Sequence, residues 1–277
     1  MPLSAGLYTA LLTPYADNGA AINAQSIGAL IEHNIGQGVD GLYIGGSTSE
    51  VFLQSVEERA QLLQMVAKEA RGKCPLIAHV GDINPRVCHH LATVATEAGY
   101  DAISALSPFY FGFSWAEIRD FYRTLAGSTD LPFVVYNFPG NSGVGITPEQ
   151  ITELLNLPNV EALKNTSADY FGMEQIVRAN PDKIVFNGYD ETILAGLAMG
   201  AQGGIGSTYN VQGYKFRALY DAFAAGDVDT AKALQGEINE LIEIIVEHGV
   251  FRSLKYLVEL EGIEMGGCRA PFHPISE

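Results

Sequence analysis

The chain has 277 residues, 47% of them hydrophobic, which is enough to bury a substantial core in one large domain or two ordinary ones. It carries 32 acidic and 16 basic residues, and the resulting formal charge of -16 repels phosphate backbones and anionic lipid. This charge argues against a nucleic-acid-binding or membrane-surface protein.

The chain contains three widely spaced cysteines, which form neither a CxxC pair nor a zinc-binding pattern. This spacing favours a reducing cytoplasm over an oxidising compartment. The amino terminus lacks the basic region and long apolar core of a signal peptide, and no run approaches the ~18 apolar residues of a membrane span. We therefore expect a soluble cytoplasmic protein. The cysteines are Cys74, Cys88 and Cys268.

Short apolar runs bounded by Gly, Pro and Asn alternate with longer amphipathic segments, which predicts strands alternating with helices. Eight such units within roughly 220 residues predict an α/β fold, a (β/α)8 barrel. A doubly wound open sheet is the alternative, although Thr13-Pro14-Tyr15 follows the first run where that fold often has a Gly-rich turn. The expected strands cover residues 6–13, 41–46, 76–81, 102–107, 133–137, 160–165, 184–187 and 203–207.

Helix starts are indicated at Asn84-Pro85, Ser114-Trp115 and Thr147-Pro148, where a capping residue precedes Pro or an amphipathic segment. After about residue 210 the pattern becomes wholly helical. The sequence thus predicts a barrel domain over residues 1–224 and a C-terminal helical extension over residues 225–277. The expected helices of this last part cover residues 214–224, 229–247 and 251–260.

Lys164 stands out among the seven lysines because it alone follows an apolar run, 160–163, whereas the other six lie in or beside polar helical or loop sequence. A buried ammonium group is costly unless it is paired or its pKa falls towards neutrality. A lysine with a lowered pKa is the nucleophile that forms Schiff bases with carbonyl substrates. The alternative is an interior lysine held by a carboxylate for structure.

Two expected strands end in sequences suited to a site, since a barrel of this kind places its site at the carboxyl ends of its strands. Residues 45–50, Gly-Gly-Ser-Thr-Ser-Glu, offer backbone N–H groups and hydroxyls to a carboxylate, although an ordinary Gly-Ser turn is the alternative. Tyr136 ends the fifth run, where it could relay protons as a general acid/base or serve only in packing.

Further strand ends carry polar or aromatic residues. Asp190 and Glu191 suit hydrogen bonding to a polyhydroxylated substrate, although Asp190 could instead cap its own helix. The loop 203–208 exposes backbone and hydroxyls, whereas the aromatic cluster 107–111 suggests packing in a core or between subunits. His79 is more readily interpreted as a hydrogen-bonded interior histidine than as a ligand, and no cluster has metal spacing, so we expect no metal.

Three motifs together resemble the dihydrodipicolinate synthase and N-acetylneuraminate lyase family of pyruvate-handling class I aldolases, which have (β/α)8 barrels. They are Gly-Gly-Ser-Thr-x-Glu at 45–50, Tyr-Asn-x-Pro at 136–139 and Ala-Leu-Lys at 162–164. The resemblance runs from Gly6 to about Pro274. Further motifs are similar to the subgroup that cleaves sialic acid: Leu-Lys-Asn-Thr-Ser at 163–167, Asn-Gly-Tyr-Asp-Glu at 187–191, Gly-Ile-Gly-Ser-Thr-Tyr-Asn at 204–210 and Gly-Val-Phe-Arg at 249–252.

The resemblance implies a role for each matching position. Lys164 would form the Schiff base without any bound cofactor, Tyr136 would transfer protons at the aldehyde oxygen, and Tyr110 would border the site at a subunit contact of a homotetramer. The implied substrate contacts are Ser47 and Thr48 for the carboxylate, and Thr166, Gly188, Asp190, Glu191 and Ser207 for the sugar chain.

The implied reaction is the reversible cleavage of N-acetylneuraminate to N-acetylmannosamine and pyruvate. The alternatives are a lyase for another 2-keto-3-deoxy sugar acid and a non-catalytic barrel that binds a keto acid. Asn141 replaces the arginine of dihydrodipicolinate synthases, which argues against aspartate semialdehyde as substrate. Ser49 replaces a usual glycine, which would cost of order 1 kcal/mol if φ were positive there. The chain stops at Glu277, where family members usually continue through one more helix.

Overall fold

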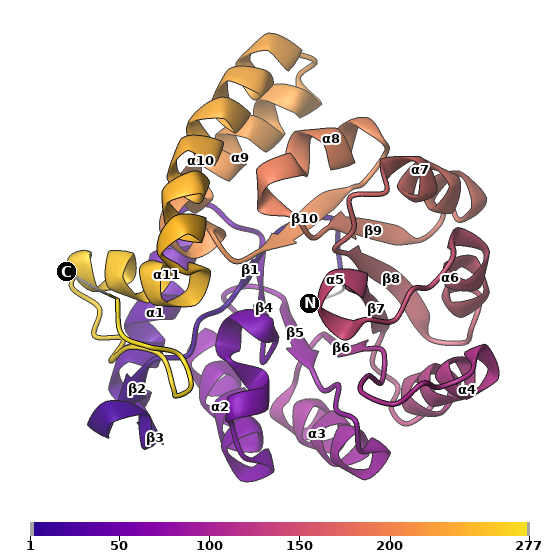
Figure 1. Cartoon of the computed structure of the whole chain (residues 1–277), viewed down its shortest axis with the longest axis horizontal. Helices are drawn as coiled ribbons and strands as arrows, with labels where there is room; N and C mark the ends of the chain where they lie inside the picture. Colours follow the sequence, from indigo (N-terminus) through magenta and orange to yellow (C-terminus); the bar gives the residue numbers. More distant parts are fainter. Residues whose placement is uncertain (1–2, 276–277) are drawn as a thin grey trace.

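The computed structural model describes residues 3–275 and contains a closed barrel of eight parallel strands ringed by helices (Figure 1). The strand order is β1-β10-β9-β8-β7-β6-β5-β4. The predicted (β/α)8 barrel is therefore confirmed, and the alternative of a doubly wound open sheet is excluded. Each barrel strand begins at the predicted residue, although β1, β4, β5, β6 and β10 end one to three residues before the predicted end. The strands are β1 (Gly6–Ala10), β4 (Gly41–Ile44), β5 (Leu76–His79), β6 (Ala102–Leu106), β7 (Phe133–Asn137), β8 (Val160–Asn165), β9 (Ile184–Asn187) and β10 (Gly203–Gly206).

Helices follow the strands on the outside of the barrel, and the predicted starts are confirmed. Asn84, Ser114 and Thr147 accept hydrogen bonds from first-turn N–H groups, and the last two form capping boxes. The helices are α1 (Ala24–Gly36), α2 (Val56–Ala70), α3 (Pro85–Ala98), α4 (Trp115–Ala126), α6 (Pro148–Leu155), α7 (Tyr170–Ala179), α8 (Ile193–Ala198) and α9 (Tyr209–Ala224).

Short elements near the strand ends were not predicted, because they are too short to show a periodic pattern. They are β2 (Tyr15–Ala16), β3 (Ala21–Ile22), α5 (Pro139–Ser142) and the single 3-10 turns η1 (Asp17–Gly19), η2 (Ser47–Ser49), η3 (Val51–Leu53) and η4 (Asp190–Thr192). Helix α9 begins at Tyr209 rather than at residue 214, and Gln212 interrupts its helical geometry.

The predicted C-terminal helical extension is confirmed. It consists of α10 (Val228–His248) and α11 (Val250–Leu260), and α10 packs along α9. Residues 261–275 then run without helix or strand to the β2–β3 pair, as Figure 1 shows at the yellow end of the chain. Met265 accepts a hydrogen bond from the N–H of Tyr15 at 2.8 Å. Across residues 3–275, no helix combines the length and apolar character needed to span a bilayer.

Two apolar layers surround the strands, because side chains alternate between the barrel interior and the helices. The outer layer joins the strands to the helices and includes Leu42, Val135 and Leu163. The interior is filled largely by Tyr8, Tyr43, Ile77, Val134, Tyr136, Ala162, Phe186 and Ile205.

A bulge in β8 decides which of its residues face the interior. Phe133 pairs with Val160 and Val134 pairs with Ala162, so Glu161 is an extra residue, and it is exposed. An extra residue reverses the alternation of side chains beyond it. Val160 accordingly packs in the outer layer, whereas Ala162 packs inside the barrel. The bulge therefore turns Lys164, two residues after Ala162, towards the interior.

Candidate active site

A cavity of about 260 Å³ lies beside Lys164, among loops that follow the strands. Every residue predicted for the site lines this cavity except Tyr110. The predicted residues that line it are Ser47, Thr48, Tyr136, Lys164, Thr166, Gly188, Asp190, Glu191 and Ser207.

Lys164 is buried between two aromatic rings. Its side chain ends with Nζ 4.5 Å from the ring centroid of Tyr43 and 4.3 Å from that of Tyr136, and only 5% of the residue is exposed. Burial lowers the pKa of Lys164 from 10.5 to about 7, although the negative charge of Asp190 opposes this shift. A substantial fraction of the amine is thus neutral near pH 7, as a nucleophile requires.

The carboxylate of Asp190 is hydrogen-bonded to Thr208. It accepts hydrogen bonds from the backbone N–H and the hydroxyl of Thr208, both at 2.8 Å. The expectation that Asp190 could cap its own helix is wrong, because its oxygen holds the start of α9 instead. Burial raises the pKa of Asp190 to about 6, while the bonds from Thr208 lower it.

Tyr136 is the neighbour of Lys164 across β7 and β8, and its side chain is buried. Burial raises the pKa of its phenol to about 12, and the polar side chains of Ser47 and Thr166 act in the opposite direction. The phenol is therefore neutral near pH 7 and lies beside groups that can exchange protons with it.

Gly188 lies directly against Thr166, whose hydroxyl is buried and has no hydrogen-bond partner among residues 3–275. A Cβ atom at position 188 would lie 1.9 Å from the Thr166 Oγ1 atom. Glycine is therefore required at 188, and the Thr166 hydroxyl stays available to a ligand.

The turn after β4 brings Ser47 and Thr48 to the cavity. Gly45 has a φ of +76°, and the hydroxyls of Thr48 and Ser207 are hydrogen-bonded at 2.7 Å across the cavity wall. Among the described non-glycine residues of this turn, Glu50 has a positive φ, of 59°, and Ser49 does not. Ser49 therefore does not carry the backbone strain that a positive φ would cause.

Ser49 instead ties the turn to the barrel. Its hydroxyl donates to the carbonyl oxygen of Leu11 at 2.6 Å and accepts from the N–H of Gly45 at 3.1 Å. A glycine could make neither bond, so this serine gives the turn an anchor of its own.

His79 is a hydrogen-bonded interior histidine, as the sequence indicated. Its Nε2 atom accepts from the N–H of Leu106 at 3.2 Å, so Nδ1 carries the proton that it donates to the carbonyl oxygen of Gly45 at 3.0 Å. Burial, Arg59 and Lys164 lower the pKa of His79 to about 3. Within the described part of the chain, no group of three or more His, Cys, Asp or Glu side chains is placed to hold a metal ion.

The C-terminal extension also contributes to the cavity, which the sequence analysis missed. Gln235 and Asn239 of α10 donate to the carbonyl oxygens of Asp190 and Glu191, at 3.3 and 3.0 Å. Its apolar lining residues are Ile242, Ile245, Val246, Val250 and Phe251. The Gly-Val-Phe-Arg motif at 249–252 was the available signal for Phe251.

Tyr110 lies away from the cavity of its own chain. It is 85% exposed, has a φ of 77° and stacks edge-on against the exposed ring of Phe111. Its place at a subunit contact stays a prediction. Tyr43 was also missed, although it is a member of the strand that leads into Gly45 and its ring flanks Lys164.

A buried lysine of lowered pKa, a neighbouring phenol and a hydroxyl-bearing turn place this chain in the class of (β/α)8 barrels with an aldolase-type lysine site. The whole described chain fits one family within that class. The chain belongs to the dihydrodipicolinate synthetase family, whose model matches residues 3–277.

Individual relatives are similar over nearly their whole length. The N-acetylneuraminate lyase of Salmonella typhimurium is 48% identical over 274 residues, which are 98% of this chain and 92% of the relative. CdNal from Clostridium difficile, solved in complex with mannosamine, is 35% identical with a TM-score of 0.96, and the match covers 99% of this chain and 94% of that one. N-acetylneuraminate lyase from Fusobacterium nucleatum complexed with pyruvate is 36% identical with a TM-score of 0.93, covering 99% and 92%.

Proposed function

We propose that this protein is a class I aldolase that cleaves N-acetylneuraminate reversibly to N-acetylmannosamine and pyruvate through a Schiff base on Lys164. The observation that carries the proposal is the burial of Lys164 between two tyrosine rings, with a pKa of about 7. The choice of substrate rests on the relatives, one of which was solved with mannosamine and another with pyruvate.

The chemistry follows from an electron sink at Lys164. The neutral amine adds to the C2 keto carbon of the open-chain sugar acid, and loss of water leaves a protonated imine. The C3–C4 bond then breaks, its electron pair moves towards the imine nitrogen, and the C4 hydroxyl loses its proton to give the aldehyde. The resulting neutral enamine is protonated at C3, and hydrolysis of the imine releases pyruvate and restores Lys164.

Tyr136 is proposed to move the proton of the C4 hydroxyl. Because its pKa is about 12, the phenol is neutral before reaction, so it acts as a relay that passes one proton on as it accepts another. Ser47 and Thr166 beside it offer hydroxyls for the next step of such a relay.

The remaining predicted residues are proposed to bind the substrate. Ser47 and Thr48 present hydroxyls to the carboxylate, from a turn whose glycines allow close approach of the backbone. Other residues that line the cavity offer polar groups to the sugar chain, namely Thr166, Gly188, Asp190, Glu191 and Ser207. Asn141 also lines the cavity, and its uncharged amide suits a polyol better than a second carboxylate.

Assembly and location belong to the same proposal. We propose a homotetramer in which the exposed Tyr110 reaches a neighbouring subunit, in line with its 85% exposure in a single chain. The cytoplasm is the proposed compartment, because Cys74, Cys88 and Cys268 are all free thiols.

Reduction of the imine tests the proposal. The purified protein is incubated with pyruvate and borohydride, and its intact mass is measured. We expect one reduced pyruvate adduct per chain, located on the peptide that contains Lys164. Lys164→Met should gain no mass, whereas Lys183→Met, which removes a lysine at the opposite end of the neighbouring strand β9, should still gain it. The proposal fails if the wild-type protein gains no adduct or if Lys164→Met retains it.

A further inference from the structure

Glu50 occupies a position that its backbone does not favour. It directly follows the Ser47–Ser49 turn and has left-handed φ and ψ values of 59° and 39°. For a residue other than glycine this conformation costs roughly 1–2 kcal/mol. The turn contains glycines at 45 and 46, yet a glutamate stands at the strained position, so its side chain must hold it there.

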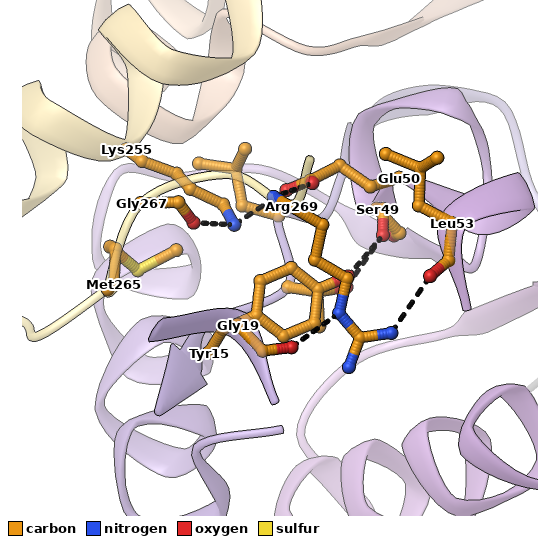
Figure 2. Close-up of polar contacts among 12 residues, drawn as sticks. Tyr15, Gly19, Ser49, Glu50, Leu53, Lys255, Met265, Gly267 and Arg269 are labelled. Carbon is orange, nitrogen blue, oxygen red and sulfur yellow. Dashed lines mark hydrogen bonds and ion pairs between the residues drawn. The ribbon is translucent and has the colours of Figure 1, made fainter. Parts of the chain in front are cut away.

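The Glu50 carboxylate is held by two residues from the C-terminal extension, as Figure 2 shows. Its Oε1 atom lies 2.6 Å from Nζ of Lys255, and both side chains are almost completely buried, with exposures of 0% and 1%. Its Oε2 atom accepts from the backbone N–H of Arg269 at 2.7 Å. Each oxygen thus has a partner that lies more than 200 residues away in the sequence.

The same two residues anchor the segment that carries them. Lys255 on α11 also donates a hydrogen bond to the carbonyl oxygen of Gly267 at 2.6 Å. Arg269 donates to the carbonyl oxygens of Gly19 at 2.8 Å and Leu53 at 2.9 Å, as drawn in Figure 2. Glu50 at the end of the turn, Leu53 just after it and the Gly19 loop are therefore tied through Arg269 to one strap of chain, residues 265–269.

Tyr15 lies between the two cations. The Lys255 ammonium is 4.2 Å and the Arg269 guanidinium 4.4 Å from the centroid of its ring. The strap also approaches its backbone closely, since a Cβ atom at Gly266 would lie 2.0 Å from the Tyr15 carbonyl oxygen. The strap is therefore held in close contact both with Tyr15 of β2 and with Glu50 at the end of the turn.

Stability alone does not explain this arrangement. A buried ion pair often contributes no more than a well-packed apolar pair, because its desolvation offsets the attraction between its charges. A buried ion pair does fix the relative position of its two side chains, because a buried charge without its partner is energetically costly. Here the ion pair fixes the position of Glu50. Glu50 follows Thr48 by two residues, and Ser47 and Thr48 line the lysine cavity.

We propose that Glu50, Lys255 and Arg269 are positioning residues that fix the turn on which Ser47 and Thr48 hold the substrate carboxylate. None of the three lines the lysine cavity, so they act through the turn. This inference rests on the proposed function, because it assumes that the turn binds the carboxylate of a keto acid.

The test measures carboxylate affinity separately from imine chemistry. Lys255→Met keeps the length of the side chain and removes its charge. The concentration of pyruvate that gives half-maximal borohydride trapping should rise about tenfold, because small misplacement of binding groups is costly. The maximal trapping rate at saturating pyruvate should stay within about twofold of wild type, as expected when ground-state binding alone is lost.

Arg217→Met is the matched control. It removes a half-buried ion pair with Asp40, whose carboxylate accepts from the N–H of Leu7 near the start of β1, at the other end of the barrel. Both variants should lower the melting temperature, but only Lys255→Met should change half-saturation. The inference is overturned if Lys255→Met traps pyruvate with wild-type half-saturation, or if Arg217→Met shifts it equally.

Two further results keep the outcomes distinct. If Lys255→Met does not fold, Glu50→Gln/Lys255→Met, which leaves no charge of the pair buried, is measured against the same criteria. Wild-type protein that forms no adduct at any pyruvate concentration would contradict the proposed function itself, whereas normal wild-type trapping with an unshifted variant contradicts only the positioning role.

Discussion

The ammonium nitrogen of Lys164 lies 4.3 Å from the centroid of the Tyr136 ring, and the two residues are paired neighbours on β8 and β7. Both side chains are buried, and burial disfavours the charged form of each. It therefore lowers the pKa of the amine to about 7 and raises the pKa of the phenol to about 12. Near pH 7 a substantial fraction of the amine and nearly all of the phenol are therefore neutral, and both residues line the same small cavity. This pairing suits the proposed roles of Lys164 as the nucleophile and Tyr136 as the proton relay, because no stable ion pair forms between them.

The pH dependence of imine formation should report the pKa of Lys164. Because only the neutral amine adds to a keto group, the initial rate of pyruvate trapping should rise with pH, with a midpoint near pH 7. Trapping is measured by mass at short times across the pH range. A midpoint near the ordinary lysine value of 10.5 would contradict the assigned effect of burial.

The pH dependence of the free energy of unfolding should also depend on the protonation of Lys164. Between about pH 7 and 10.5 the unfolded chain binds a proton at Lys164 that the folded protein does not, so this residue makes the free energy of unfolding rise with pH. Lys164→Met should lose that part of the slope and be at least as stable as wild type near pH 7, since a costly buried amine is gone. Denaturant titrations at several pH values measure it, and an unchanged slope in the variant would refute the prediction.

Asp190→Asn should move the midpoint of trapping to lower pH. The Asp190 carboxylate is the charge that raises the pKa of Lys164 against the effect of burial, so its neutralisation removes that support. Glu191→Gln is the control, because Glu191 does not contribute to the shift at Lys164 and its midpoint should not move. A midpoint that stays constant in Asp190→Asn, or moves upward, would disprove this coupling.

Tyr136→Phe should separate imine formation from bond cleavage. Without the hydroxyl, pyruvate trapping at Lys164 should continue, whereas pyruvate release from the sugar acid should fall by about 10²–10⁴-fold, the range for loss of a general acid/base. Tyr43→Phe is the matched control, since its ring also flanks Lys164 but its hydroxyl donates to Ser104 at 3.0 Å. Equal losses of release in the two variants would exclude a specific relay at Tyr136.

Ser49→Gly should destabilise the protein. The variant loses the bonds to Leu11 and Gly45 and gains no relief of strain, because Ser49 does not have a positive φ. The expected loss is about 1–3 kcal/mol in the free energy of unfolding. Ser49→Ala removes the same bonds without adding backbone freedom and should account for most of it. Wild-type stability in both variants would show that the bonds are dispensable.

The fold was largely predictable because its signals are local. Each strand begins where an apolar run begins, and the capping residues Asn84, Ser114 and Thr147 start their helices as expected. The general rule that barrel sites lie at the carboxyl ends of strands was then sufficient to predict that Tyr136 and Lys164 lie in one site.

Long-range packing was not predictable in the same way. The bulge at Glu161 leaves no pattern in a six-residue strand, yet it decides that Lys164 faces inward. Lys255 lies in a helix, as its sequence context indicated, but its burial was not predicted: it is 1% exposed, whereas Lys164 is 5% exposed. Its helix has charged neighbours, and its partner Glu50 is about 200 residues away, so nothing local marks the pair.

Pyruvate release from N-acetylneuraminate by the purified protein, beside Lys164→Met and with 2-keto-3-deoxygluconate as a second substrate, tests the central claim most directly. The account predicts preferential release from N-acetylneuraminate and none from the variant. Release only from the shorter sugar acid would keep Lys164 but contradict the substrate. Release by Lys164→Met at the wild-type rate would contradict the mechanism.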